Sequence, residues 1–535
     1  MNYNSNQYKY PSRRSVVYSN KGMVCTSQPL AAQAGLDILK MGGNAIDAAI
    51  ATAVCLTVVE PTSNGIGGDS FALVWNNNKL SALNASGPAP GLINAEAIKK
   101  QGFKDIPETG WIPVTVPGTP SAWAELSKKF GTLPFEQLFK PAIDYAFNGF
   151  PVSPVIAMLW EREYEKFNTL SQPEYLKNWF DIFAPAGRAP KPGEIWRSQD
   201  HARTLKEIAA TRAESFYRGT LAEKMDSFSK SESGFIRYAD LEKYSPEWVT
   251  PIKINYKGYE IWEMPPNTHG LVALLGLNIL NGFDLKEKET ISTYHLQIEA
   301  LKNAFSDGIK YIADPKYMTV DLDYILSESY AAKKRASITE LAADLGISDQ
   351  RKGGTVYLCS ADAKGNMVSY IQSNYQGFGS GIVVPHTGIA LHNRGNNFSL
   401  NNNSVNFIEP GKKPYHTIIP AFITKNGKAI GPFGVMGGFM QPQGHLQVVS
   451  NLVDFNLNPQ EALDAPRWQW LKGNKIIVEK ELSSSIKKEL ILRGHQVEEA
   501  IDSLSFGRGQ IIMKDDNDVL IGASEPRADG TVAAW

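Results

Sequence analysis

The tripeptide Gly353-Gly354-Thr355 stands at the head of a strand-like stretch and carries residue types that could act on the chain itself. Two glycines allow a backbone geometry that other residues resist, and attack of a threonine hydroxyl on its own preceding carbonyl would require such geometry. Cleavage before Thr355 would free an α-amino group with an ordinary pKa near 8. Thr355 would then be nucleophile and base in one residue. A Gly-Gly turn before a strand is the competing interpretation.

Other sequence signals of chemistry are incomplete. The chain has no G-x-x-x-x-G-K-[ST] motif, which excludes a P-loop nucleotidase, and GIGGDS and GFGSGI do not complete a dinucleotide-binding motif. Residues 68–72 fall one glycine short of a serine-hydrolase elbow, and a turn into a strand explains them equally well. The eight histidines show no metal-ligand spacing, so we predict no metal.

The residues that follow Gly354 are predicted to hold Thr355 at the end of a hairpin. Residues 355–361 and 367–373 each alternate like a strand, and DAKGN supplies the turn between them. A short helical pattern at 338–345 runs into residues 346–354, whose polar, Gly-rich composition predicts an exposed linker.

The first half of the chain predicts helices and a strand pair. One helix begins with Ser27 as N-cap and ends at Gly42-Gly43, and Asn44 caps a second one over 45–59, which is apolar on nearly every face and therefore buried. Strands are predicted at 71–75 and 80–86. Further helices are expected at 121–131, 136–149, 201–225 and 292–312, with a strand-like stretch at 252–264.

The second half predicts strands at 382–385, 417–424 and 428–433, then a helix over 445–454. Together these elements favour an α+β fold with sheets at its centre.

Composition excludes several classes of function. The 535 residues are 43% hydrophobic and 20% charged, as in soluble globular proteins. The net charge of -1 gives no basic surface for nucleic acid or an anionic membrane. Cys25, Cys55 and Cys359 form no C-x-x-C pair, so we expect buried thiols in a reducing compartment. No secretory signal is recognisable and residues 45–59 fall short of the about 20 residues of a membrane span, so we expect a cytoplasmic protein.

A series of motifs along nearly the whole chain resembles the gamma-glutamyltranspeptidase family, the glutathione hydrolase proenzymes, which are N-terminal-nucleophile hydrolases. The series includes GGNAIDAAIAT at Gly42, EPTSNGIGGDSF at Glu60, TVYLCSADAKGN at Thr355, FGVMGG at Phe433, DAPRW at Asp464 and GASEPRADG at Gly522. The resemblance implies a four-layer αββα sandwich with additional helices in the large fragment. It also implies a proenzyme that cuts itself into fragments 1–354 and 355–535, which stay together and need no metal or organic cofactor.

By this resemblance Thr355 is the catalytic threonine and Gly354 the residue before the cut. Ser373 falls where the family has a second threonine that hydrogen-bonds the nucleophile, and a serine hydroxyl can do the same. Gly437 and Gly438 match the pair whose backbone N–H groups form the oxyanion hole. Without the flanking match this pair would be interpreted as a simple turn.

The substrate-binding positions depart from the family pattern. Ser86 falls where transpeptidases have an arginine for the substrate α-carboxylate, Asn397 replaces the aspartate that binds the α-amino group, and Arg394 replaces a neutral polar residue. His416 and Thr417 stand for two paired serines, and Tyr375 for a polar side chain beside the second threonine. This pocket has lost an ammonium site and gained a cation, which predicts an acyl group with a carboxylate and no free amine.

The resemblance and its departures leave three hypotheses. The first is a γ-glutamyltransferase or glutathione hydrolase-like amidohydrolase of glutathione metabolism, whose acyl-enzyme is released to water or an amine acceptor. The second is a cephalosporin-acylase-like hydrolase of glutaryl-type amides. The third, an unprocessed binding protein, is disfavoured because Thr355, Ser373 and the glycine pair keep usable chemistry. The segment between Asn397 and Lys412 is shorter than the family's lid loop, which favours hydrolysis. A homo-oligomer is left open.

Overall fold

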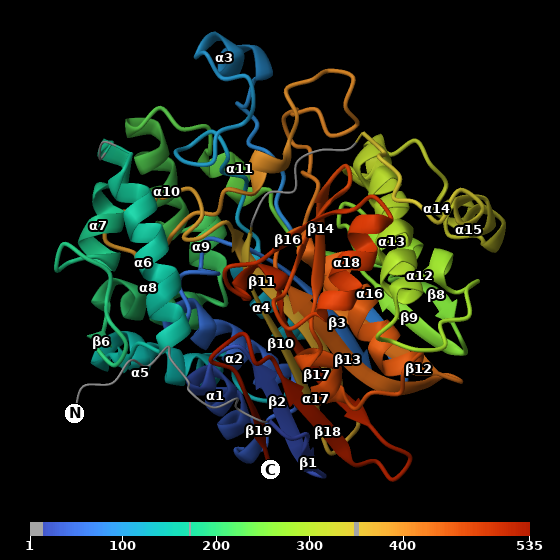
Figure 1. Cartoon of the computed structure of the whole chain (residues 1–535). Coiled ribbons are helices and arrows are strands. Elements are labelled where there is room, and N and C mark those ends of the chain that lie inside the picture. Colours follow the sequence, from blue (N-terminus) through green and yellow to red (C-terminus); the bar gives the residue numbers. More distant parts are fainter. Residues whose placement is uncertain (1–13, 171–172, 347–352) are drawn as a thin grey trace.

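The computed structural model describes residues 14–170, 173–346 and 353–535, and most of its strands lie in two seven-stranded antiparallel sheets (Figure 1). The first sheet has the order β1 (Val17–Ser19), β18 (Leu520–Ser524), β17 (Arg508–Lys514), β13 (Lys428–Met436), β12 (Ala421–Lys425), β9 (Tyr259–Glu263) and β8 (Ile252–Tyr256). The second has the order β19 (Thr531–Ala534), β2 (Gly22–Thr26), β10 (Gly354–Asp362), β11 (Met367–Tyr375), β3 (Asp69–Asn76), β4 (Lys79–Ala85) and β7 (Glu247–Val249).

Two smaller sheets and the helices surround this centre. The small sheets are β14 (Trp468–Lys472), β15 (Lys475–Val478) and β16 (Gln496–Glu499), and β5 (Phe150–Pro151) with β6 (Ile195–Trp196). The helices of the first half are α1 (Pro29–Lys40), α2 (Ala45–Val59), α3 (Ala95–Lys100), α4 (Thr119–Phe130), α5 (Lys140–Asn148), α6 (Pro154–Asn168), α7 (Lys177–Phe183), α8 (Gln199–Thr211), α9 (Glu214–Arg218), α10 (Thr220–Ser231) and α11 (Tyr238–Glu242).

The later helices are α12 (Gly270–Leu280), α13 (Ile291–Tyr311), α14 (Leu322–Ile325), α15 (Glu328–Arg335), α16 (Met440–Val453), α17 (Pro459–Asp464) and α18 (Ser484–Leu492). Short 3₁₀ turns are η1 (Phe135–Phe139), η2 (Glu174–Leu176), η3 (Pro315–Tyr317), η4 (Arg394–Asn397) and η5 (Leu504–Phe506). The α+β class predicted from the sequence is confirmed.

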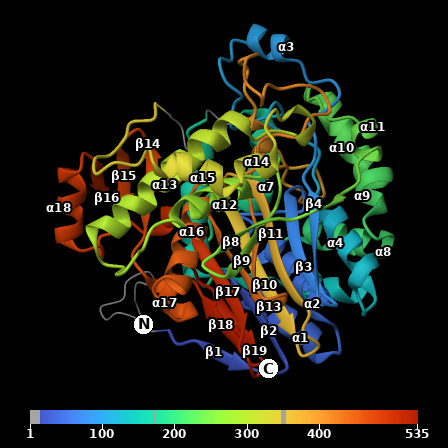
Figure 2. The same cartoon turned by 90° about the vertical axis from the view of Figure 1, so that its right-hand side faces the viewer.

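Three main apolar clusters hold these elements together. One combines residues of both large sheets, among them Phe71, Tyr357 and Ile371 of the second sheet with Phe422 and Ile512 of the first. A second cluster joins α2 with α4, α5 and α8, and a third joins α12, α13 and α16 with strands of the first sheet. Figure 2 shows the strands in the middle of the molecule, with α16 and α17 to one side and α1, α2 and α4 to the other.

Most predicted elements are present, and their caps follow local chemistry. The helix over 45–59 is α2; as the sequence predicts, it is buried along its whole length and capped by Asn44, and Asp47 completes a capping box with that residue. The cap predicted for α1 is wrong by one residue. Gln28 accepts from the backbone N–H groups of Leu30 and Ala31, whereas the Ser27 hydroxyl donates to Glu60.

Two predicted elements are absent from the described residues, and several observed elements, among them α12, were not predicted. Residues 338–345 contain no helix, because their backbone groups bind other elements: the N–H of Ala343 donates to Glu299 and that of Ala342 to the carbonyl of Arg493. Residues 382–385 form a single bridge, Val383 with Ala390, rather than a strand. The sequence reasoning missed α12, a continuous apolar run whose pattern does not separate a buried helix from a strand.

The helix predicted over 201–225 is divided, because Arg212 and Ala213 adopt left-handed conformations and Gly219 interrupts the chain again. In the predicted linker, residues 347–352 lie outside the described part of the chain, while Gly354 already belongs to β10. The three cysteines are free and buried, as predicted. Within residues 14–170, 173–346 and 353–535, no helix is both long and apolar enough to cross a membrane.

Candidate active site

Thr355 occupies an irregular position at the start of β10. Gly354 pairs with Tyr375 and Val356 with Gln372, so the register shifts opposite Thr355, where two residues of β11, Ser373 and Asn374, face this one residue of β10 in a bulge. Its side chain is buried, and its Oγ1 lies 2.8 Å from the carbonyl oxygen of Gly354 and 3.0 Å from Oγ of Ser373. The hydroxyl is therefore held beside the peptide bond at which cleavage is predicted.

Ser373 is arranged as a hydrogen-bond donor to the same carbonyl. Its Oγ accepts from the N–H of Tyr375 at 2.7 Å and from Nη2 of Arg394 at 3.5 Å, and it lies 2.7 Å from the Gly354 oxygen. Because a carbonyl only accepts and a serine hydroxyl has one proton, Ser373 donates that proton to Gly354. Such a donor would stabilise the negative charge that an attack on this carbonyl places on its oxygen.

Gly437 and Gly438 form the turn between β13 and α16, whose N-terminus begins at Met440. Their φ angles of 146° and 59° lie in the region that favours glycine. A Cβ on Gly353 would lie 3.2 Å from Cα of Gly438, so the chain just before Thr355 passes directly over this turn. The positive end of the helix dipole adds to the backbone N–H groups there, which makes the turn suited to an oxyanion.

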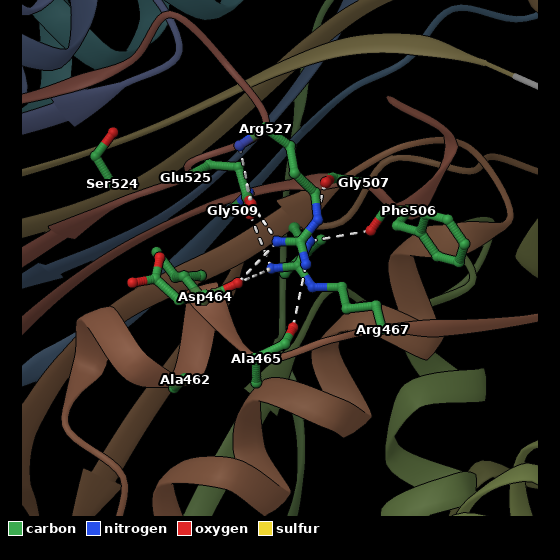
Figure 3. A network of polar contacts seen from close by, with 12 residues as sticks. Ala462, Asp464, Ala465, Arg467, Phe506, Gly507, Gly509, Ser524, Glu525 and Arg527 are labelled. Carbon is green, nitrogen blue, oxygen red and sulfur yellow. Dashed lines mark hydrogen bonds and ion pairs between the residues drawn. The ribbon is translucent and has the colours of Figure 1, made fainter. Parts of the chain in front are cut away.

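A buried ionic network, shown in Figure 3, holds the Phe506-Gly507 segment that lies next to this turn. Arg467 donates through Nη1 to the carbonyls of Phe506 and Gly507 and pairs through Nη2 with Glu525 at 2.8 Å. Gly507 in turn touches the oxyanion turn, because a Cβ on Gly437 would lie 3.1 Å from Cα of Gly507. A continuous series of contacts therefore connects Glu525, through Arg467 and Gly507, with Gly437.

Arg527 completes the network by pairing with Glu525 at 2.6 Å and with Glu479 at 2.5 Å. Burial by itself would raise the pKa of Glu525, but the neighbouring Arg467 and Arg527 lower it, so this carboxylate stays ionised. Two cations and two anions therefore balance each other inside the protein. Arg467 lies in the DAPRW motif and Glu525 and Arg527 in GASEPRADG, both of which the sequence comparison identified without a role.

Arg394 places a positive charge beside Ser373. The side chain is fully buried, donates through Nη1 to Oγ1 of Thr417 at 2.6 Å and lies with its guanidinium carbon 4.2 Å from the centre of the Tyr375 ring. Burial lowers its pKa to about 10, so it remains charged at neutral pH. Nε has no hydrogen-bond partner among the described residues.

Of the remaining predicted substrate residues, some lie beside Arg394 and others form hydrogen bonds with residues away from it. Tyr375 adopts a left-handed conformation, φ 73°, which is costly for an aromatic residue and typical of functional sites. Asn397 donates to the carbonyl of Tyr415, and Ser86 exchanges hydrogen bonds with Asn84 and Asn267. The structure thus brings Thr355, Ser373, Tyr375, Arg394 and Thr417 together, while Ser86 and Asn397 bind elsewhere.

Sequence reasoning missed Asp69, the first residue of β3 and the partner of Ser373 across the strand pair. Its Oδ1 accepts from the N–H groups of Gly87 and Gly118, and its Oδ2 lies 3.0 Å from Nε2 of His416. Burial raises the pKa of Asp69 to about 7, against the opposing positive charge of Arg394. The GIGGDS motif contains this residue, but an acidic side chain next to a glycine-rich turn does not by itself indicate a functional role. The strand start confirms that residues 68–72 are a turn into a strand.

One cluster in the described chain has the composition of a metal site: His295, Glu299 and His495. Their geometry favours hydrogen bonding instead, since Nδ1 of His295 lies 3.0 Å from Nε2 of His495 and the Lys302 ammonium lies 2.7 Å from Oε1 of Glu299. A divalent cation would compete with that ammonium for the same carboxylate oxygen. We assign no metal to these residues.

Comparison with known proteins places these features in a family. The family Gamma-glutamyltranspeptidase matches residues 31–535. The glutathione hydrolase-like YwrD proenzyme of Bacillus subtilis (strain 168) is 36% identical over 527 residues, covering 96% of this chain and 98% of that protein. The oxamate amidohydrolase proenzyme of Klebsiella pneumoniae is 33% identical, with 97% and 99% covered. The crystal structure of cephalosporin acylase from Bacillus halodurans matches with a TM-score of 0.97 and 56% identity, covering 100% of this chain and 99% of that one.

Proposed function

This chain belongs to the gamma-glutamyltranspeptidase family of N-terminal-nucleophile hydrolases, and we propose that it is a self-processing amidohydrolase that prefers acyl groups bearing a terminal carboxylate. The proposal includes a proenzyme cut between Gly354 and Thr355 and an αββα layering of its two fragments. It has two parts, the processing and the acyl preference.

For processing, the hydroxyl of Thr355 attacks the carbonyl carbon of Gly354, and the C–N bond breaks as the Thr355 nitrogen takes a proton. The ester that results is hydrolysed by water to the Gly354 carboxylate and a free Thr355. The hydrogen bond from Ser373 to the Gly354 oxygen supports this step, because it stabilises the charge of the tetrahedral intermediate.

In the processed enzyme, the Thr355 amine takes the proton of its own hydroxyl as the oxygen attacks the substrate amide. The N–H groups of Gly437 and Gly438 hold the oxyanion. The Thr355 ammonium then returns its proton to the substrate's amine, which leaves, and an acyl-threonine ester remains. Water then releases the acid, or an amine acceptor takes the acyl group. Each bond that forms is matched by one that breaks.

The observation that carries the acyl preference is the buried guanidinium of Arg394 beside Ser373. A buried cation favours a carboxylate, whereas the neutral Asn397 offers no charge to an ammonium. The similarity to a protein named cephalosporin acylase, and to one named for oxamate, the monoamide of a dicarboxylic acid, supports the same preference. The names of other relatives favour γ-glutamyl substrates, which remain the alternative.

Substrate profiling tests the preference. We expect glutaryl p-nitroanilide to be hydrolysed with a kcat/KM at least about tenfold above that of γ-glutamyl p-nitroanilide, the size of a charged-partner effect. Arg394→Gln is expected to lose this ratio, and Arg162→Gln, at an exposed ion pair, to keep it. A γ-glutamyl preference in the parent, or equal ratios in the parent and Arg394→Gln, would contradict the proposal.

A further inference from the structure

Behind Arg394 lies a buried group of one carboxylate and two imidazoles. Oδ2 of Asp69 lies 3.0 Å from Nε2 of His416 and 3.6 Å from Nδ1 of His392, and all three side chains are fully buried. His416 directly precedes Thr417, which binds Arg394, and Asp69 pairs in register with Ser373, which Arg394 also contacts. The carboxylate and the guanidinium are thus linked through neighbouring residues, and each charge acts on the pKa of the other group.

The hydrogen bonds fix where protons can sit in this group. Nε2 of His392 lies 3.0 Å from the carbonyl of Thr115, and since a carbonyl only accepts, this nitrogen carries the hydrogen. Burial and the charge of Arg394 lower the pKa of His392 to about 3, so the ring is neutral and its Nδ1 is an acceptor. Nδ1 of His392 and Oδ2 of Asp69 therefore face each other as two acceptors 3.6 Å apart with no hydrogen bond between them, and a proton on Oδ2 would allow one to form when the two atoms approach.

We propose that Asp69 is a specificity-determining residue that binds a proton when the carboxylate of a substrate acyl group binds the guanidinium of Arg394. This inference rests on the proposed function of Arg394. While Asp69 is ionised it neutralises the guanidinium and repels the substrate carboxylate. Once it is protonated, on the oxygen that faces His392, the full charge of Arg394 is available to the substrate.

The titratable groups around Asp69 leave it as the one that changes charge near neutrality. Burial lowers the pKa of His416 and of His269 well below the ordinary range, so both rings stay neutral. Burial raises the pKa of Tyr217 and Tyr244, which therefore stay protonated. The remaining charges that act on Asp69 are Arg394 and Lys413, and both oppose its protonation.

The pKa of Asp69 is raised to about 7, so the residue is neutral below this pH and anionic above it. The free carboxylate of a glutaryl group is ionised throughout pH 5.5 to 8.5, because the ordinary pKa of such a carboxyl group is about 4.3. Binding of a glutaryl group is therefore expected to weaken as pH rises through about 7, by about tenfold, a typical coupling between two sites. By reciprocity, the substrate carboxylate raises the proton affinity of Asp69 by the same factor.

Kinetics of the processed enzyme test this with two anilides. The ratio of kcat/KM for glutaryl p-nitroanilide to that for the uncharged pentanoyl p-nitroanilide cancels the titration of the Thr355 amine, which both share. We expect this ratio to fall about tenfold from pH 6 to pH 8.5. Calorimetry of glutarate binding at pH 7.5, in two buffers of different ionisation enthalpy, is expected to show proton uptake.

Asp69→Asn holds the site neutral at every pH, and its amide can donate to Nδ1 of His392. We expect the ratio to stay at the low-pH value of the parent and proton uptake to vanish, while Asp518→Asn, on the surface, behaves as the parent. A pH-independent ratio above one in the parent, or proton uptake that persists in Asp69→Asn, overturns this inference but not the proposed function. A parent ratio of one at all pH values overturns the proposed function itself. If Asp69→Asn yields no processed enzyme, the parent's ratio and proton uptake decide.

Discussion

Among single residues near the cleavage site, Ser373 has the most contacts with a chemical consequence. It accepts from the N–H of Tyr375 and from Arg394, and it donates to the carbonyl of Gly354, the proposed target of Thr355. Two donors on its oxygen make the hydroxyl proton a stronger donor, because hydrogen bonds in a chain polarise one another. Self-cleavage should therefore depend on this hydroxyl.

Ser373→Ala is expected to slow self-cleavage by about 100-fold, the usual loss for one oxyanion donor, and Ser373→Thr to restore it. The measurement is the half-life of the precursor on denaturing gels after cell-free synthesis. Ser70→Ala is the matched control, a buried serine on β3 that pairs with Gln372. Equal half-lives for Ser373→Ala and the parent would show that the hydrogen bond plays no part in processing.

The residues at this scale were predictable to different degrees. Thr355 and the glycine pair were assigned from motifs that match the family, and Ser373 from its alignment with the family's second threonine, so these roles could be predicted from the sequence. Asp69 did not, because its role depends on His416 and His392, which lie more than three hundred residues further along the chain and meet it only through the fold. The hydrogen bond from Asn267 to Ser86 was not predictable for the same reason, because the two residues are far apart in the sequence.

At the scale of elements, the oxyanion turn is held between β13, α16 and the Phe506-Gly507 segment. Arg467 fixes that segment through two carbonyls with one planar side chain, and Glu525 holds the arginine. A lysine keeps the charge but lacks the fork that reaches both carbonyls. The position of the turn should therefore depend on arginine at this position.

Arg467→Lys is expected to lower kcat for glutaryl p-nitroanilide by about tenfold with little change in KM, because the oxyanion hole acts on the transition state. Arg162→Lys, in an exposed ion pair, should change neither. Steady-state kinetics of the processed enzymes give both parameters, and thermal unfolding reports stability. A lower Tm with an unchanged kcat would mean that the network stabilises the fold without positioning the turn.

The elements themselves were predictable where local chemistry decides them. The Asn44 cap before an apolar run and the alternation of residues 355–361 predicted α2 and β10 correctly. Residues 338–345 were not predictable, because their helical pattern yields to hydrogen bonds from Glu299 and Arg493, which only the tertiary structure supplies. The apolar run of α12 lacked the polar residues that mark one face of a helix.

At the scale of the whole molecule, the two predicted fragments are interleaved. Within the second large sheet, β10 pairs with β2 and β11 pairs with β3, so strands from residues 355–535 lie between strands from residues 1–354. The cluster between the sheets also contains residues from both parts. Cleavage at Gly354 would leave these contacts in place, so the fragments are expected to remain associated.

Intact mass of the purified protein, measured under native and denaturing conditions beside Thr355→Ala, tests the central claim most directly. Shared in proportion to length, the 58.9 kDa chain predicts denatured fragments of about 39 and 20 kDa for the parent, with Thr at the new N-terminus and one associated species under native conditions. Thr355→Ala should remain a single chain. A parent that stays uncut would contradict the N-terminal threonine mechanism and favour an unprocessed binding protein on this fold. A Thr355→Ala variant that is cut at the same bond would show that Thr355 is not the nucleophile of the cleavage.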